Sequence, residues 1–265
     1  MPRTALILSS GRTGTRFLAE YFDANFEGVV ARHEPRPARS MRLASNAHLS
    51  GVLPRRAMVW MLRRKRRHHI DPIRAELYIE ANPFLSGFIR VLGDVFEEPT
   101  VIHVVRDPRE QVRSSLNHGT GSGLKALANR FAPCWYPDAA GILQLRAASG
   151  WFGRAACFWT LINRELEQGG AGCAGYHRFK FEDVFDATSS GLRAMCGALG
   201  LDYRDSTRRL DPSTRINPGR LDRLPPWREW SPEQCAELHR ICSPLMREYG
   251  YGSEPEWLER VAGHD

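Results

Sequence analysis

Short apolar runs alternate along this chain with segments of helical periodicity. The apolar runs are rich in β-branched or aromatic residues and predict strands over residues 5–8, 29–31, 77–79, 101–105 and 177–181. Apolar residues three or four positions apart predict helices over residues 17–22, 110–116, 155–166, 191–199 and 232–249. This alternation is typical of a parallel sheet covered by helices on both faces. We therefore predict a three-layer α/β/α fold and expect a single domain over residues 1–265.

The carboxyl ends of the predicted strands are the first place to look for chemistry. Open parallel sheets bind their ligands in the crevice beyond these ends. The segments that follow the predicted strands are residues 9–15, 32–34, 80–83, 106–108 and 182–183. We expect them to share one edge of the sheet and to carry the functional side chains.

The segment LILSSGRTGTRFLAEYF, residues 6–22, passes from an apolar strand through a glycine turn into an amphipathic helix. Gly11 and Gly14 let the backbone turn sharply and approach a ligand closely. The first amides of a helix are unpaired and lie at the positive end of its dipole, so this turn predicts an anion site. Arg12 adds a fixed positive charge. An ordinary strand-to-helix loop with two glycines is the alternative for this segment taken alone.

Two threonines of this turn, Thr13 and Thr15, are predicted to cap the helix, which we expect to begin near Arg16. The segment does not match the Walker phosphate-binding loop, because the second glycine of that motif would fall at Arg16 and no Lys-Ser/Thr pair follows. A P-loop nucleotide kinase or ATPase is therefore disfavoured.

A second motif, VIHVVRDPREQVRSSLNH, occupies residues 101–118. Its strand is predicted to end just before Arg106, and Pro108 suits the first turn of the following helix. Arg106 and the helical Ser114 can converge on one anion, the first as a charged fork and the second as a hydroxyl donor. A strand-to-helix junction with an Arg–Asp pair is the alternative. Together with the glycine turn, the motif predicts two anion pockets, as a nucleotide phosphorylated at its 5′ and 3′ positions requires.

The net charge of +7 favours anionic partners, but its sign does not choose between nucleotides, acidic glycans, nucleic acid and a membrane surface. Most of the basic residues are arginines, and codon bias in a GC-rich genome is the alternative explanation. The most concentrated charge is the run of five basic residues Arg63–Arg67. It is a candidate contact for an acidic acceptor or an anionic surface, and a solvated helix end is the alternative.

Cysteine spacing and hydropathy limit the remaining classes of protein. The six cysteines form no C-x-x-C pair and no zinc spacing, so we expect reduced thiols and no metal site. The chain has no signal peptide and no apolar stretch that is long enough to span a membrane, which predicts a cytoplasmic protein.

The pair SSGRTGTRFL and VVRDPREQVRSS, about 90 residues apart, resembles the two donor-binding motifs of the PAPS-dependent sulfotransferases. A weaker resemblance extends to YIEANP, FKFEDVF and RINPGRLDRLPPWREW. The resemblance implies a P-loop-like sulfotransferase fold with a central parallel sheet, PAPS as the sulfuryl donor and adenosine 3′,5′-bisphosphate as the product. It leaves the segments of about residues 35–73 and 119–151 uncovered, and we expect both on the acceptor side.

The resemblance assigns Arg12 to the position of the family's catalytic Lys or Arg. It also implies that the glycine turn contacts the 5′ group, that Phe17 lies near the adenine, and that a late loop closes over the donor. Many members have two threonines after the loop glycine, whereas this chain has Thr15 and Arg16, which leaves the role of Arg16 open. The implied donor-binding residues are Ser10, Gly11, Arg12, Thr13, Gly14, Thr15, Arg16, Phe17, Arg106, Ser114, Arg215, Asn217 and Gly219.

The general base that deprotonates the acceptor is expected just beyond the second predicted strand, at His33 or Glu34. Glu34 follows Arg12 with an order and spacing similar to those of the glutamate base in carbohydrate and tyrosyl-protein sulfotransferases, so a bacterial member of that branch is implied. His33 is the second candidate, because the small-molecule cytosolic branch uses histidine. The alternative is that one of this pair only caps the strand or pairs with an arginine. Glu80 is a third candidate at the same edge.

We therefore predict a sulfotransferase that acts on an acceptor hydroxyl or amine, with a saccharide or glycolipid favoured as the acceptor. We expect no nucleic-acid partner, and the sequence leaves the acceptor's identity and the oligomeric state open. A noncatalytic module that binds a nucleotide or an anionic polymer on the same scaffold is the competing hypothesis. Trp227 and Trp230 are expected to anchor the last predicted helix against the core.

Overall fold

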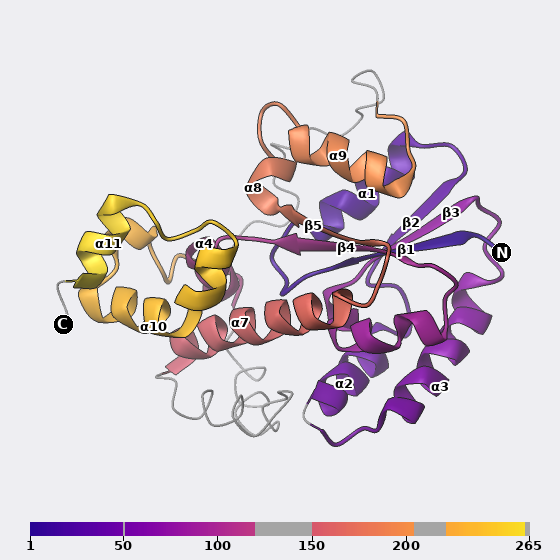
Figure 1. Ribbon diagram of the computed structural model, residues 1–265, viewed down its shortest axis with the longest axis horizontal. Coiled ribbons are helices and arrows are strands. Elements are labelled where there is room, and N and C mark those ends of the chain that lie inside the picture. The colour runs from indigo at the N-terminus through magenta and orange to yellow at the C-terminus, as the bar shows by residue number, and fades with distance from the viewer. Residues whose placement is uncertain (50, 120–149, 204–220, 263–265) are drawn as a thin grey trace. The chain divides into compact units, whose positions relative to one another are not determined.

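The computed structural model describes residues 1–49, 51–119, 150–203 and 221–262 (Figure 1). Contacts divide the chain into two units. Unit 1 comprises Met1–Val105 and Glu165–Ile216, and unit 2 comprises Arg106–Arg164 and Asn217–Asp265. The expectation of a single domain over residues 1–265 stays a prediction.

Unit 1 is built on a five-stranded parallel sheet with the strand order β2-β3-β1-β4-β5. Its strands are β1 (Arg3–Leu8), β2 (Val29–His33), β3 (Leu77–Ala81), β4 (Thr100–Val105) and β5 (Tyr176–Lys180). The four residues that end the central strand β1 are fully buried, as is typical of a parallel strand covered on both faces. The parallel sheet and its strands are confirmed, except that the last predicted strand continued to Phe181, which instead begins a helix.

Helices cover both faces of this sheet, as predicted (Figure 1). One face carries α1 (Thr15–Asn25), α8 (Phe181–Val184) and α9 (Ser190–Leu199). The other carries α2 (Ala38–Leu49), α3 (Arg55–Lys65), the π-helical turn η1 (Arg66–Ile70) and the 3-10 helix η2 (Pro83–Asp94). The long helix α7 (Gly150–Gly170) reaches unit 1 with its last residues. The sequence did not predict α2, α3 or α8.

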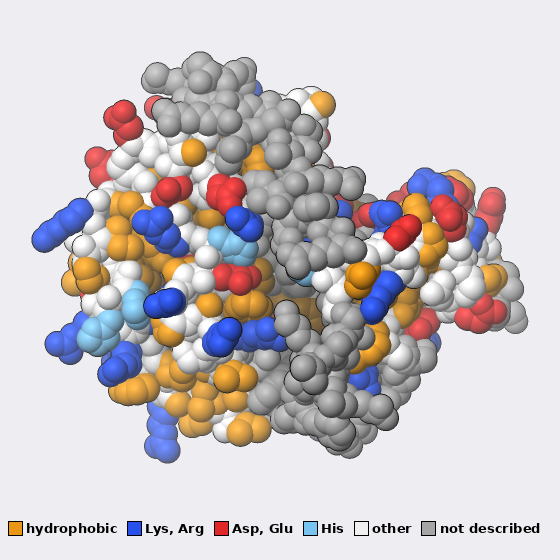
Figure 2. Space-filling view, turned by 180° about the vertical axis from the view of Figure 1, so that it is seen from behind, with side chains coloured by type: hydrophobic (Ala, Val, Ile, Leu, Met, Phe, Trp, Pro, Cys, Tyr) orange, Lys and Arg blue, Asp and Glu red, His pale blue; other side chains and the backbone are white. Residues whose placement is uncertain are grey.

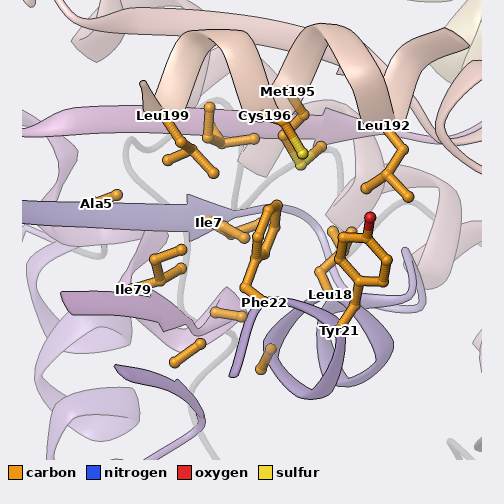
Figure 3. Close-up of a cluster of buried hydrophobic side chains, with 14 of the residues drawn as sticks. Ala5, Ile7, Leu18, Tyr21, Phe22, Ile79, Leu192, Met195, Cys196 and Leu199 are labelled. Atoms are coloured by element: carbon orange, nitrogen blue, oxygen red, sulfur yellow. The ribbon is translucent and has the colours of Figure 1, made fainter. Parts of the chain in front are cut away.

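The core of unit 1 lies between the sheet and the pair α1 and α9 (Figure 3). Leu18 and Phe22 of α1 meet Leu192 and Met195 of α9 across Ile7 of β1, and all five side chains are fully buried. Each buried side chain of this size stabilises the fold by about 1.5–3 kcal/mol. This packing fixes the start of α1 against the end of β1 and so holds the turn between them.

A polar cluster joins the β4–β5 side of the sheet to the end of α7. The His103 ring lies 2.7 Å from the Tyr176 hydroxyl and 3.6 Å from the Glu167 carboxylate, to which Arg178 donates at 3.0 Å. Burial raises the pKa of Glu167, but hydrogen bonds from His103 and Arg178 outweigh it and lower that pKa to about 2.

Unit 2 is helical in the part of the chain that the structure describes. It contains α4 (Pro108–Asn117), most of α7, the 3-10 turn η4 (Trp227–Glu229), α10 (Pro232–Glu248) and α11 (Pro255–Ala262). Trp227 packs edge-to-face against Trp257 with 5.5 Å between ring centroids, and Trp230 is buried as well. The contact with Trp257 anchors α11, whereas the anchoring of the helix over residues 232–249 by both tryptophans stays a prediction. None of the helices in the described ranges is long and apolar enough to cross a membrane.

Candidate functional site

The turn between β1 and α1 has an unusual backbone. Gly11, Arg12 and Gly14 adopt positive φ angles of 85°, 58° and 70°. The Ser9 hydroxyl holds the turn from inside, because it accepts hydrogen bonds from the Gly11 amide at 3.1 Å and from the Thr13 hydroxyl at 2.7 Å. Turns that contain left-handed residues can align successive backbone N–H groups into a concavity, and such concavities bind anions.

The start of α1 completes this anion site. Gly14 occupies the N-cap position in the left-handed conformation, no side chain among the described residues caps the helix, and its first turn contains no acidic residue. The positive end of the helix dipole is therefore uncompensated and available to an anion. The prediction that Thr13 and Thr15 cap the helix was wrong, because the Thr13 hydroxyl bonds to Ser9 instead.

Gly14 is also required by a close contact. A Cβ atom at this position would lie 2.4 Å from Cζ of Phe185, so no larger residue fits without a shift of that ring. Phe185 in turn packs edge-to-face against Phe17, with 5.3 Å between ring centroids. Phe17 is 3% exposed and belongs to the core of unit 1. This burial gives Phe17 a packing role. It does not support the predicted position of Phe17 near an adenine.

The two arginines of the turn have different surroundings. Arg12 is partly buried and held at a positive φ that a non-glycine residue adopts only at a cost of roughly 1–2 kcal/mol. Backbone strain of this kind clusters at binding and catalytic sites. Arg16 lies on the exposed surface of α1 and donates to Glu20 at 2.8 Å. The described contact of Arg16 is therefore a surface ion pair.

His33 and Glu34 lie directly at the carboxyl end of β2, as predicted. Glu34 has a positive φ of 45°, and its amide donates to the carbonyl of Ala81 at 3.2 Å. Burial raises the pKa of the Glu34 carboxyl, while the positive charge of Arg42 partly opposes this shift. A raised pKa makes Glu34 a stronger base than an exposed glutamate, provided that it is ionised.

The imidazole of His33 is the second basic group at this edge. Burial lowers its pKa, and the charge of Arg16 lowers it further against the opposing effect of Glu20. These charges act on His33 from α1, so the start of α1 and the end of β2 lie close together. Atom Nδ1 of His33 is buried without a hydrogen-bond partner among the described residues, and Nε2 lies 3.9 Å from Oε1 of Glu34. The lowered pKa favours the neutral form of the ring, which can accept a proton or a hydrogen bond.

Glu80, the third candidate base, is committed to a buried network instead. Its fully buried carboxylate pairs with Nζ of Lys65 at 2.7 Å and accepts hydrogen bonds from the Tyr78 hydroxyl at 3.1 Å and the Asn82 amide at 2.8 Å. A carboxylate with three partners and no exposure is a poor proton acceptor for a substrate. The network also removes Lys65 from the surface run Arg63–Arg67, which the sequence did not indicate.

The second motif begins with β4 in unit 1, and from Arg106 onward it lies in unit 2, where it starts α4. The Arg106 carbonyl accepts a hydrogen bond from the Trp159 indole at 2.9 Å. The Arg–Asp pair considered for this motif is formed by Arg109, whose guanidinium contacts Asp107 and Glu254 at 2.6 Å each. Arg109 is thus a structural arginine. Ser114 is half-buried on α4, where the sequence predicted it.

Asn117 at the end of α4 is a positioning residue that sequence reasoning missed. Its side-chain oxygen accepts hydrogen bonds from the amides of Arg223 and Leu224 at 2.9 Å, and its nitrogen donates to the Leu224 carbonyl at 3.0 Å. Asn117 lies within the second motif, but the motif does not indicate this role, because its partners are more than 100 positions away in the sequence. The predicted donor residues Arg215, Asn217 and Gly219 lie outside the described residues.

Comparison with known proteins identifies the fold. No protein-family model matches the sequence, and no curated protein matches it. The structure resembles the sulfotransferase domain from the curacin biosynthetic pathway with a TM-score of 0.55 and 14% identity, over 95% of this chain and 98% of that one. It also resembles a sulfotransferase from Alicyclobacillus acidocaldarius with a TM-score of 0.53 and 15% identity, over 97% and 99% of the two chains. This chain has a sulfotransferase fold.

The sulfotransferase fold of this chain places several predicted site residues at one edge of the sheet. The glycine turn follows β1, and His33 ends β2 and is followed by Glu34, so both segments lie at the carboxyl ends of parallel strands. Arg106 directly follows β4 along the chain and belongs to unit 2. Within unit 1, the candidate site therefore combines a turn whose geometry suits an anion with two candidate bases of perturbed pKa.

Proposed function

We propose that this protein is a PAPS-dependent sulfotransferase that acts on a hydroxyl or amine acceptor, with a saccharide or glycolipid hydroxyl favoured. The observation that carries the proposal is the glycine turn between β1 and α1, with its three left-handed residues and uncapped helix start. An anion of the size of a phosphosulfate matches the hydrogen-bond donors of such a turn. The sulfotransferase fold of the chain favours sulfuryl transfer as the reaction.

The donor site is assigned to residues of both motifs. The turn of Ser10–Thr15 and the first amides of α1 bind the 5′-phosphosulfate. Arg106 and Ser114 bind the 3′-phosphate. The guanidinium can donate two hydrogen bonds to the phosphate, and the hydroxyl can donate one. The assignment of the phosphosulfate to this turn is supported by the absence of acidic residues from the first turn of α1, because an acidic side chain there would repel the donor.

Arg12 stabilises the charge that develops on the leaving phosphate. In PAPS the sulfur–oxygen bond to the 5′-phosphate breaks as the acceptor oxygen binds to sulfur, so negative charge grows on that phosphate. A fixed cation in a turn that is already organised stabilises such charge without reorganisation. The strained backbone of Arg12 supports this role, because the fold maintains an unfavourable φ at that residue.

Glu34 accepts the proton of the acceptor hydroxyl. Its raised pKa brings the carboxyl closer to the range in which a base works efficiently near neutral pH. The lowered pKa of His33 favours its neutral form, and its buried Nδ1 has no partner among the described residues, so it can orient the acceptor or take over as the base. Comparison of the Glu34→Gln and His33→Gln variants decides between the two bases.

The donor site is tested first, by calorimetry of the purified protein with adenosine 3′,5′-bisphosphate, ADP and ATP. We expect a clear preference for the bisphosphate, which Arg106→Ala reduces and the exposed control Arg193→Ala preserves. Equal affinity for the three nucleotides would show that no 3′-phosphate site exists. Failure of all three to bind would remove the donor proposal and leave a module that binds some other anion.

Turnover tests the catalytic roles after acceptors have been screened with PAPS. Arg12→Ala should lower kcat by about 100- to 1,000-fold, the usual effect of removing one charge-stabilising donor. Glu34→Gln should lower it by about 100- to 10,000-fold with nearly unchanged affinity for the bisphosphate, and the exposed Glu27→Gln is its control. Full activity of Glu34→Gln would transfer the role of the base to His33.

A further inference from the structure

The segment of residues 36–69, here called the basic segment, has an unusual charge. It contains ten Lys or Arg residues and no Asp or Glu. In the structure it forms α2, α3 and most of η1, which lie on one side of the sheet of unit 1 (Figure 1). Such a concentration of positive charge creates a local electrostatic field that attracts anionic partners.

Part of this charge is neutralised within the fold. Lys65 is buried against Glu80, Arg55 pairs with Asp94 at 2.6 Å, and Arg66 pairs with Asp71 at 3.2 Å.

Three other arginines, Arg56, Arg64 and Arg67, are exposed and have no ion pair among the described residues. Arg64 follows Arg56 by eight residues and Arg67 follows Arg64 by three, and these spacings place them along one face of α3 and its continuation into η1. Part of the charge that remains for a partner therefore lies along one stripe, and the exposed arginines Arg36, Arg39, Arg42 and Arg63 of the same segment carry the rest.

The same segment exposes large apolar side chains. Leu43 is 58% exposed, Val52 74% and Trp60 63%, although these residue types are usually buried. Trp60 lies between Arg56 and Arg64 on the arginine stripe, and the Arg64 guanidinium lies 5.9 Å from its ring centroid. Figure 2 shows basic and hydrophobic side chains intermixed over this part of the surface. This combination is typical of surfaces that enter the interface of a bilayer, where tryptophan is enriched.

A surface cavity of about 520 Å³ lies beside the stripe, between α2 and the end of α3. Its apolar lining comes from Pro37, Met41 and Trp60, and its basic lining includes Arg64 and His68. An apolar wall next to basic side chains matches the junction between the acyl chains and the phosphate of a phospholipid. The cavity thus supplies a concave surface beside the basic and exposed apolar side chains.

We propose that the basic segment docks the protein on a bilayer that contains anionic phospholipids. Trp60 enters the interface, and Arg56, Arg64 and Arg67 contact the phosphates. The exposed aliphatic side chains Leu43 and Val52 favour a bilayer over a nucleic acid or a soluble anion, because only a bilayer offers them an apolar environment. The proposal goes beyond sulfuryl transfer and stands independently of it.

Vesicle co-sedimentation of the full chain tests the proposal. We expect binding to vesicles of phosphatidylcholine with phosphatidylglycerol, weak binding to pure phosphatidylcholine, and a loss of binding as NaCl is raised. Because each basic residue at a membrane surface contributes about fivefold in affinity, the triple variant Arg56→Ala, Arg64→Ala, Arg67→Ala should bind about 100-fold more weakly.

A second triple variant is the matched control. Arg193→Ala, Arg240→Ala, Arg247→Ala removes the same charge from exposed positions of α9 and α10 and should bind within a few fold of wild type. Circular dichroism verifies that both triple variants are folded. Equal losses in the two variants would mean that net charge alone drives binding, and would overturn the assignment to the basic segment.

The fluorescence of Trp60 reports insertion directly. The emission of the wild-type protein should shift to the blue on anionic vesicles and be quenched by brominated lipids, and Trp60→Phe should lose most of both effects. Inorganic phosphate at matched ionic strength should not displace the protein from the vesicles. Displacement by phosphate would indicate a site for a small anion, and unchanged quenching in Trp60→Phe would show that this surface does not enter the bilayer.

Discussion

The replacement Gly14→Ala tests the geometry on which the candidate site depends. Gly14 has a φ of +70°, and an added Cβ would lie 2.4 Å from Cζ and 2.8 Å from Cε2 of Phe185. Gly11 in the same turn has a φ of +85°, but a Cβ there would meet no heavy atom within 4 Å. The two replacements therefore share the backbone strain, and only one of them adds a steric clash.

The expected magnitudes follow from this difference. A left-handed alanine costs roughly 1–2 kcal/mol, and overpacking in a filled core costs about 1–3 kcal/mol more. Gly11→Ala should thus lower the free energy of unfolding by about 1–2 kcal/mol, and Gly14→Ala by about 2–5 kcal/mol. In a chain of this size the second change lowers Tm by roughly 2–4 °C for each kcal/mol.

Urea unfolding followed by circular dichroism measures both values, and Phe185→Leu in the Gly14→Ala background separates the clash from the strain. The double variant should recover about 0.5–3 kcal/mol relative to the sum of the single changes, because the smaller side chain leaves room for the methyl group. Equal stabilities of Gly14→Ala and Gly11→Ala, or strictly additive effects in the double variant, would refute the close approach of α8 to the turn. Both glycine variants should also bind adenosine 3′,5′-bisphosphate less tightly.

Three further predictions follow from ionisable groups. Lys65→Met should lower the free energy of unfolding by about 3–5 kcal/mol in urea titrations, because it leaves the buried Glu80 carboxylate without its cation, and adding Glu80→Gln should restore part of the loss. The acid limb of kcat/KM against pH should lie above the ordinary glutamate pKa, because burial raises the pKa of Glu34, and Glu34→Gln should remove the limb. The lowered pKa of Glu167 makes its carboxylate stabilising above its unfolded pKa and progressively less so as the pH falls toward about 2. Glu167→Gln should therefore flatten the loss of stability in acid, and an unchanged slope would show that other carboxyls cause it.

The sequence was sufficient for the features that depend on short stretches of chain. Apolar runs such as residues 5–8 and 101–105 identified the strands, because a strand buried on both faces must be apolar at nearly every position. The glycine turn and Glu34 were located by their position directly after such strands. By contrast, α2 has buried residues at helical spacing, Met41, Ala44, Ser45 and Leu49, but polar and basic neighbours obscured them.

The tertiary structure alone decided the environment of individual side chains. Lys65 lies within a run of basic residues, and only the position of β3 shows that it is buried against Glu80. Likewise, Asp107 pairs with Arg109, which also reaches Glu254 nearly 150 positions later. Strand propensity and glycine turns are set by neighbouring residues. Burial, ion pairing and pKa depend on groups that only folding brings together.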